Sequence, residues 1–286
     1  IMRYATPASA KEAAGLMSKE KGAAFLLAGG TDLLVKLKMG MVEPDLVVDI
    51  KRIPKIDEIQ ASAKGFTIGA AVSGSVIGQH KALKAAWCVV EAANLIGSDQ
   101  IQGRATLAGN LCNASPAADS VPAMIAAGAK AVIVGPQKKR TVAVEKVVLG
   151  PGQTCLAKGE VIEAITLPKP ESRTGDAYLR FIPRTEMDIA VVGVAISLKL
   201  ERGVVKKAKV VLGAVAPTAV VVPAAAKALV GSKLDDAALD KLAAACSAAC
   251  NPIDDKRGTV EYRTRVAGVL AKRAAKIAFQ RAGGAL

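Results

Sequence analysis

The sequence predicts an α+β protein of two domains, an α/β domain followed by a smaller α+β domain. The 286 residues are too many for a comfortable single core. Apolar residues make up 51% of the chain and charged residues 22%, so a packed interior is expected and disorder is not. Predicted helices and strands alternate in the first part of the chain, whereas strands precede helices in the last part.

The first domain is assigned to residues 1–174, in two subdomains of about 1–55 and 56–174. Apolar residues recur at helical spacing after Thr6-Pro7, which suits the start of a helix. A short apolar run then enters the Gly29-Gly30 pair, which is typical of a strand that ends in a tight turn. The expected helices are 5–22, 75–96 and 116–127, and the expected strands are 24–27, 45–50, 65–71, 131–135 and 161–167. Residues 97–109 are expected to form a loop.

The second domain is assigned to residues 175–286. The proline-rich exit Pro168-Lys169-Pro170 and the polar residues 171–175 mark the boundary. Two β-rich runs follow, joined by the turn 201–203, and the remainder has helical patterning. The expected strands are 189–200 and 207–215, and the expected helices are 224–230, 236–250 and 259–281.

The net charge of +14 permits an anionic partner or ligand. Residues 256–281 carry eight basic residues against one acid, Glu261, and on a helix this pattern indicates a solvated face or a docking face. Aromatic residues are only 3% of the chain, which argues against an aromatic groove for single-stranded nucleic acid. We therefore expect no nucleic-acid partner.

The sequence favours the cytoplasm. No stretch reaches the roughly 18 apolar residues that a spanning helix needs, so no transmembrane segment is expected. Residues 1–4 lack the layout of a signal peptide. The cysteines are odd in number and irregularly spaced, which argues against a disulfide framework and for a reducing compartment. They are Cys88, Cys112, Cys155, Cys246 and Cys250.

Two glycine-rich segments are candidates for holding an anionic ligand, residues 26–33 and residues 106–110. Backbone N–H groups can approach a phosphate closely where glycine removes the side chain. Ser115-Pro116 follows the second segment and is expected to open a helix. Neither segment is a GxGxxG fingerprint or a Walker loop. Taken by itself, each segment is more often an ordinary turn.

The same segments resemble the FAD-binding medium subunits of molybdenum hydroxylases, in residues 28–34, 97–101 and 106–119. That family includes the flavin subunits of carbon monoxide dehydrogenase, nicotinate dehydrogenase and bacterial xanthine dehydrogenase. The resemblance covers nearly the whole chain, with several motifs in the same order. In the second domain it rests on Tyr178-Leu179-Arg180-Phe181, Arg184, Asp188-Ile189-Ala190, residues 212–218 and Tyr262-Arg263.

The resemblance implies the two-part FAD-binding fold of vanillyl-alcohol oxidase, followed by the α+β domain, with FAD bound non-covalently. The first glycine segment would wrap the pyrophosphate and the second would hold its other side. Asp119 would bind toward the ribityl or adenosine portion, and Ile96 and Ile162 would lie against the isoalloxazine. Arg180 would lie near the flavin ring and favour its reduced anion. The expected cofactor-binding residues are Leu26, Leu27, Ala28, Gly29, Gly30, Thr31, Asp32, Leu33, Ile96, Thr106, Gly109, Asn110, Asn113, Ser115, Asp119, Ile162 and Arg180.

The chain departs from the family pattern in a few places. Ala108 stands where the family usually has glycine, and Gln102-Gly103 replaces a commoner Arg-Asn pair. The four-cysteine insertion that carries an iron–sulfur cluster in 4-hydroxybenzoyl-CoA reductase is absent. We therefore assign no metal and no catalytic residue to this chain.

Several single residues have a structural interpretation that is simpler than a functional one. His80 is expected at the surface or a helix end rather than as a flavin tether or a triad member. Cys246 and Cys250 are expected to fill the core rather than bind metal. Cys112 lies inside the second glycine segment, and buried packing is expected there rather than redox chemistry.

The function that the resemblance implies is electron transfer. The chain would be the flavin subunit of a larger oxidoreductase, taking electrons from [2Fe-2S] clusters in a small partner subunit. A large subunit would carry the molybdopterin cofactor, in a dimer of heterotrimers. Two alternatives stay open: a stand-alone FAD-dependent reductase of the same fold, such as the enolpyruvyl-glucosamine reductases, and a basic non-catalytic binding module. The substrate and the terminal electron acceptor are not predicted.

Overall fold

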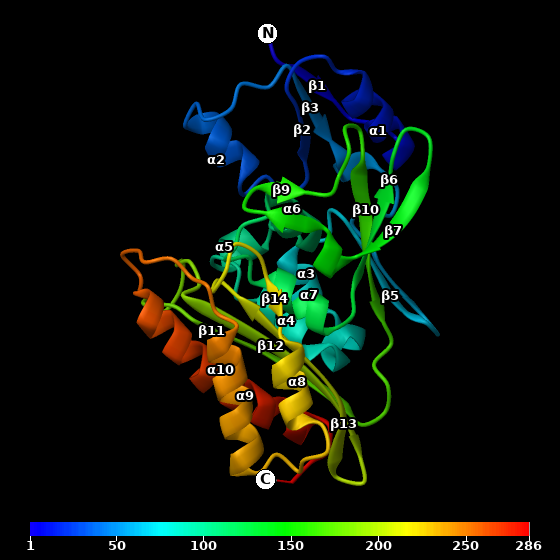
Figure 1. Cartoon of the computed structure of the whole chain (residues 1–286). Coiled ribbons are helices and arrows are strands. Elements are labelled where there is room, and N and C mark those ends of the chain that lie inside the picture. Colours follow the sequence, from blue (N-terminus) through cyan, green and yellow to red (C-terminus); the bar gives the residue numbers. More distant parts are fainter. Residues whose placement is uncertain (286) are drawn as a thin grey trace.

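The computed structural model describes residues 1–285, and Leu286 lies outside the described residues. The chain begins with a three-stranded parallel sheet in the order β1-β3-β2, at the N-terminal end of the molecule (Figure 1). Leu46, Val47 and Val48 in the central strand are all buried. The elements here are β1 (Arg3–Ala5), α1 (Ala10–Lys19), β2 (Ala24–Leu27), α2 (Leu33–Lys38), β3 (Leu46–Asp49) and the 3₁₀ turn η1 (Ile50–Arg52).

A five-stranded antiparallel sheet follows, in the order β4-β5-β10-β6-β7. Its strands are β4 (Ile59–Ser62), β5 (Gly65–Gly69), β6 (Lys130–Val134), β7 (Lys139–Ala143) and β10 (Val161–Pro168). A separate small hairpin is formed by β8 (Val148–Gly150) and β9 (Gln153–Thr154), and β9 contacts α6. The helices of this part are α3 (Gly74–Gln79), η2 (Lys81–Ala85), α4 (Trp87–Ala93), α5 (Asp99–Gln102), α6 (Leu107–Asn113), α7 (Ser120–Ala126) and η3 (Val144–Lys146).

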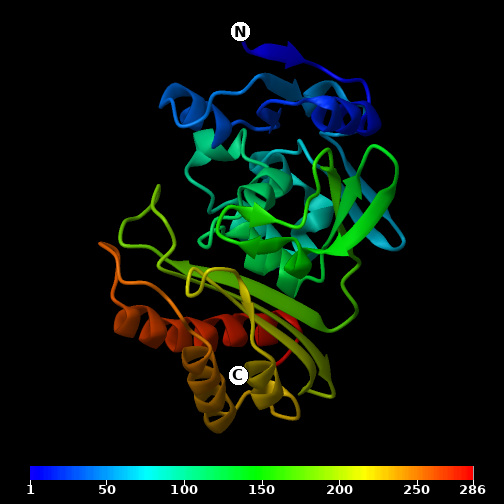
Figure 2. The same cartoon turned by 45° about the horizontal axis from the view of Figure 1, so that its top comes forward.

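The C-terminal part is a four-stranded antiparallel sheet with three helices. The sheet has the order β11-β12-β13-β14, and Figure 2 shows it lying between α10 on one side and the helices of the first domain on the other. α4 and α7 contact this sheet from the first domain. The elements are β11 (Thr174–Phe181), β12 (Val192–Glu201), β13 (Val204–Gly213), β14 (Val220–Val221), α8 (Pro223–Leu229), α9 (Asp236–Ala248) and α10 (Val260–Arg281).

The hydrophobic core continues across the join between the two domains. The larger buried cluster includes Met124 of α7 together with Tyr178, Ala195 and Val211 of the C-terminal sheet. A second cluster fills the space between the other face of that sheet and α8–α10. Because one sheet contributes side chains to both clusters, the C-terminal domain is held against the first domain by apolar packing.

The basic stretch near the C-terminus is partly explained by ion pairs of α10. Arg263, which is buried, pairs with Asp255, Lys272 pairs with Asp240 of α9, and Arg281 pairs with Glu91 of α4. Three of the basic residues therefore connect α10 to neighbouring segments.

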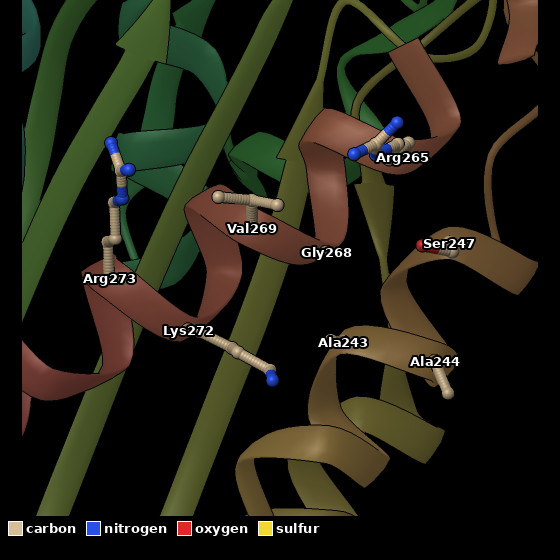
Figure 3. A pocket seen from close by; sticks show the side chains of 8 residues that line it. All are labelled: Ala243, Ala244, Ser247, Arg265, Gly268, Val269, Lys272 and Arg273. Carbon is tan, nitrogen blue, oxygen red and sulfur yellow. The ribbon is translucent and has the colours of Figure 1, made fainter. Parts of the chain in front are cut away.

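α9 and α10 cross closely, and a hollow of about 410 Å³ lies beside the crossing (Figure 3). A methyl group added at Gly268 would come within 3.0 Å of the Ser247 hydroxyl oxygen and 3.1 Å of the Ala243 carbonyl oxygen. Arg265 and Arg273 lie at the hollow, and Arg273 points away from α9 (Figure 3). Small residues such as Gly268 and Ala243 allow the close approach of the helices.

The α+β fold class predicted from sequence is confirmed, and strand 24–27 has the predicted bounds. Residues 97–109 were predicted as loop, but α5 lies within them and α6 begins at Leu107. The prediction that Ser115-Pro116 opens a helix is wrong. The Ser115 hydroxyl accepts from the Ala117 amide at 3.3 Å and closes a turn, so α7 begins only at Ser120.

Candidate functional site

A cleft of about 390 Å³ lies where the three-stranded sheet meets α6 and β10. β2, the turn after it and α2 form one side, and α6, β10 and Ile96 contribute to the other. Both glycine-rich segments reach this cleft, although 72 residues lie between them in the sequence. The predicted residues that line it are Leu26, Ala28, Gly29, Gly30, Thr31, Asp32, Leu33, Ile96, Thr106, Gly109, Asn110, Asn113 and Ile162.

The turn after β2 presents backbone N–H groups that have no partner in the protein. Within residues 1–285, the amides of residues 29–32 donate no hydrogen bond. A side chain at Gly29 would overlap the carbonyl oxygen of Arg104, and Gly30 has a φ of +79°, a conformation that favours glycine. The Lys51 ammonium donates to the Ala28 carbonyl at 3.2 Å, which fixes the backbone before the turn. Consecutive free amides at a cleft form a site for an anion.

The second segment is the first turn of α6 rather than a loop. Thr106 is the N-cap, and its hydroxyl oxygen accepts from the Gly109 amide at 2.9 Å. On the next turn the Asn110 side-chain oxygen accepts from the Ser120 hydroxyl at 2.6 Å and from the Ser120 amide at 3.3 Å. The cap and the Ser120 contacts therefore hold Gly109 and Asn110 in place at the cleft.

Comparisons with known proteins identify the family. Residues 1–170 match the FAD binding domain in molybdopterin dehydrogenase, and residues 177–278 match the CO dehydrogenase flavoprotein C-terminal domain. The chain belongs to the FAD-binding medium subunits of the molybdenum hydroxylases. This subunit is thus part of an oxidoreductase family whose members include carbon monoxide and xanthine dehydrogenases.

Individual relatives resemble the medium subunit over nearly its full length. It is 33% identical to the carbon monoxide dehydrogenase medium chain of Hydrogenophaga pseudoflava, with 97% of each chain covered. A solved carbon monoxide dehydrogenase from that organism has a TM-score of 0.93, with 98% of each chain covered. Quinoline 2-oxidoreductase from Pseudomonas putida 86 is 26% identical with a TM-score of 0.90, and the match covers 99% of this chain and 98% of that one.

The cleft of this medium subunit suits a dinucleotide. The free amides of residues 29–32 fit a pyrophosphate, since glycine lets the backbone approach its oxygens. Ile96, Ile162 and Leu156 supply an apolar part of the lining, which fits the flat surface of a ring system. The residues present therefore agree with the cofactor that the family binds.

Asp119 and Arg180 lie outside the lining of the cleft and bind each other. The Arg180 guanidinium is 2.7 Å from one Asp119 oxygen, and the Tyr178 hydroxyl donates to the other at 2.7 Å. All three side chains are buried at the join between the domains. Burial raises the pKa of Asp119 although Arg180 opposes this, and burial beside Asp119 raises the pKa of the Tyr178 hydroxyl well above its ordinary value.

Leu27 and Ser115 also lie outside the lining. A methyl group added at Gly30 would lie 3.1 Å from a Leu27 methyl, so the Leu27 side chain packs behind the turn. Ser115 closes the turn that follows α6. The roles predicted for Leu27, Ser115, Asp119 and Arg180 toward FAD stay predictions.

The sequence-based prediction missed two charged residues in the lining, Lys36 and Glu160. Cys112 is an exposed residue in the lining of the cleft, which corrects the expectation of buried packing. Glu160 forms a two-point contact with Arg140, at 2.7 Å for each pair. Only an i, i+4 spacing from Asp32 marked Lys36 in the sequence, and that signal is too common to single it out.

The remaining candidates have structural positions. His80 is the C-cap of α3, as expected of a helix-end residue. Cys246 is buried in the C-terminal core and Cys250 is partly buried beside it. Within residues 1–285, no group of three His, Cys, Asp or Glu side chains could hold a metal ion, and none of the helices combines the length and hydropathy of a membrane-spanning segment.

Proposed function

We propose that the subunit binds one FAD in the cleft and relays electrons from the [2Fe-2S] clusters of a small partner subunit to an external acceptor. The observation that carries this proposal is the run of free amides at residues 29–32, facing a cleft that the second glycine segment also reaches. FAD supplies chemistry that connects one-electron and two-electron carriers. The medium subunit's own residues bind and orient it.

Each part of the cleft has a role in this proposal. The amides of residues 29–32 hold the pyrophosphate, and the turn of α6 at Gly109 and Asn110 closes its other side. Ile96 and Ile162 cover the isoalloxazine and exclude water from its face. Arg180 and Asp119 pair with each other at the join to the C-terminal sheet, and we propose that Arg180 lies near the flavin ring.

The cleft contains little of what substrate chemistry would need. Among the described residues that line it, the charged side chains are Asp32, Lys36 and Glu160. Glu160 is held by Arg140, which keeps the pKa of its carboxyl below the ordinary value. A stand-alone reductase of this fold would need a proton donor for its own substrate, so the composition of the lining favours electron relay. If the chain were a basic binding module without a cofactor, the free amides of residues 29–32 would have no ligand to bind.

Partner subunits are proposed to cover apolar surface beside the cleft. Leu34, Val35, Met39 and Met41 are at least half exposed, and α2 buries none of its residues. α2, the loop between β11 and β12, and the loop before α10 lie on the same side of the molecule in both views (Figures 1 and 2). The second and third also expose apolar residues, Met187, Ile189 and Ile253. Exposed apolar surface of this kind is typical of subunit interfaces.

The names of the relatives support this assembly. Two are the medium chains of carbon monoxide dehydrogenases. One solved carbon monoxide dehydrogenase lacks the Mo-pyranopterin part of its molybdenum cofactor. On this basis we propose a complex with a small iron–sulfur subunit and a large molybdopterin subunit, and we further propose that it forms a dimer of heterotrimers.

Purification from the native source tests the proposed complex. We expect the medium subunit to co-purify with one chain that carries iron and acid-labile sulfide and one that carries molybdenum, each in a one-to-one ratio with it. Native mass spectrometry gives the ratio, and metal analysis identifies the cofactors. A homogeneous, flavin-loaded chain without other subunits would contradict the proposed complex and favour the stand-alone reductase.

A further inference from the structure

The cleft lining carries more acidic than basic side chains, although its proposed ligand is an anion. A basic residue is therefore needed to offset the repulsion. Asp32 and Glu160 are acidic, and Lys36 is the single basic residue among the described lining residues. Arg140 neutralises Glu160, but Asp32 has no ion pair within residues 1–285. A pyrophosphate brings negative charge to the same cleft and would meet the Asp32 carboxylate. Lys36 is the lining side chain that can offset this repulsion.

The position of Lys36 is fixed by a chain of hydrogen bonds across the cleft. Its ammonium donates to the side-chain oxygen of Asn113 at 3.0 Å, and the Asn113 amide nitrogen donates to Asp32 at 3.1 Å. Lys36 and Asp32 belong to α2 and its N-cap, whereas Asn113 is the last residue of α6. The contacts therefore connect the two glycine segments and keep the lysine partly buried at the cleft.

We infer that Lys36 is a binding residue for the pyrophosphate of FAD, which extends the proposed function and rests on it. A lysine ammonium has three N–H donors, and Asn113 accepts from one, so two remain for phosphate oxygens. The Asn113 contact holds the ammonium of a residue that lines the same cleft as residues 29–32, whose amides donate no hydrogen bond among the described residues. Lys36 thus adds a formal positive charge to an anion site that is otherwise formed by the backbone N–H dipoles of residues 29–32.

The same helix offers a matched comparison. Lys38 follows Lys36 by two residues, is exposed, and is absent from the lining of the cleft. Residues two apart on a helix do not share a face. A general effect of the chain's positive charge on an anionic ligand would depend on both lysines, whereas direct binding depends on Lys36.

The test is a titration of cofactor-free protein with FAD, followed by flavin fluorescence or calorimetry. We expect Lys36→Met to weaken FAD binding by about tenfold, the low end of the range for hydrogen bonds to a charged group. Lys36→Arg should retain most of the affinity, and Lys38→Met should bind like the wild type. Raising the salt concentration should weaken wild-type binding more than binding to Lys36→Met. Salt screens the attraction between the Lys36 ammonium and the phosphates, and the variant lacks this attraction.

Fragments of the cofactor separate pyrophosphate binding from a structural effect. The affinity for ADP should fall with that for FAD in Lys36→Met, whereas any affinity for adenosine should be unchanged. An equal loss for ADP and adenosine would assign Lys36 a structural role and overturn the inference. Wild-type affinity in Lys36→Met, or an equal loss in Lys38→Met, would also overturn it. Wild-type protein that binds no FAD would refute the proposed function itself, so the two failures are distinguishable.

Discussion

Only glycine fits at position 29 unless the backbone moves. A Cβ there would overlap the carbonyl oxygen of Arg104, in the chain segment that leads into α6. The turn after β2 and the segment before α6 are therefore in direct backbone contact, and glycine makes that contact feasible. Gly30 contributes differently, through its φ of +79°. The cradle for the pyrophosphate depends on both residues.

A pair of glycine substitutions tests this view at the residue scale. Gly29→Ala should displace the turn and weaken FAD binding by more than about tenfold, which corresponds to about 1.4 kcal/mol. Gly15→Ala is the control, since Gly15 lies inside α1 and nothing is within 4 Å of an added methyl group. That variant should leave FAD binding unchanged and stabilise the protein by about 0.5–1 kcal/mol. Flavin titration and chemical denaturation measure the two effects, and equal FAD affinity in both variants would contradict the account.

At the scale of elements, one ion-pair network joins two loops of the C-terminal domain. Asp188, in the loop between β11 and β12, contacts Arg257 at 2.8 Å and Arg184 at 3.2 Å. The hydrogen bond from Arg257 and the Ile189 amide lower the pKa of Asp188 from 3.8 to about 2. Arg257 precedes α10, so this carboxylate connects the β11–β12 loop to the start of that helix.

The lowered pKa has a consequence for stability in acid. A carboxyl group with a lower pKa in the folded state stabilises that state above its unfolded pKa, and the contribution disappears as the pH falls through the folded pKa. The contribution of Asp188 is thus present above about pH 4 and is lost between about pH 4 and pH 2. We expect the melting temperature of Asp188→Asn to fall less steeply than that of the wild type across this interval. Parallel curves would show that Asp188 does not contribute.

Several elements could be predicted from the sequence because their signals are local. The apolar run of β2 and the helical spacing in α9 and α10 are complete within their own segments, and the predicted elements lie at these places. β1 and β11 were not predicted. Three-residue β1 has too little sequence to show a period, and β11 mixes glycine, aspartate and arginine because it packs against α4 and α10. Pairing between distant segments determines these strands.

The candidate site was predictable for a different reason. Glycine positions reflect backbone geometry, so both glycine segments could be found in the sequence. The resemblance to the family then predicted that both bind the same cofactor. Lys36 and Glu160 were missed because their significance depends on partners far away in the sequence, Asn113 and Arg140. Arg180 was expected near the flavin ring, and its buried pair with Asp119 could not be inferred without the join between the domains.

The whole molecule joins a cofactor cleft to a C-terminal sheet through one continuous hydrophobic core. α4 contributes to this join through Glu91, which accepts from the Tyr178 amide at 2.9 Å and pairs with Arg281 of α10. The apolar side chains of α2 and of the two C-terminal loops remain exposed beside the cleft. Continuous apolar packing between the domains, together with exposed apolar surface beside the cleft, suits a subunit that binds a cofactor and docks to partners.

The flavin content of the purified medium subunit shows whether the cleft binds FAD. The protein is expressed, its visible absorption spectrum is recorded, and the cofactor is released by denaturation and identified by mass spectrometry. We predict one FAD per chain, released without hydrolysis, with a yellow colour that disappears on reduction. A correctly folded protein that is colourless and takes up no added FAD would show that the cleft is not a flavin site.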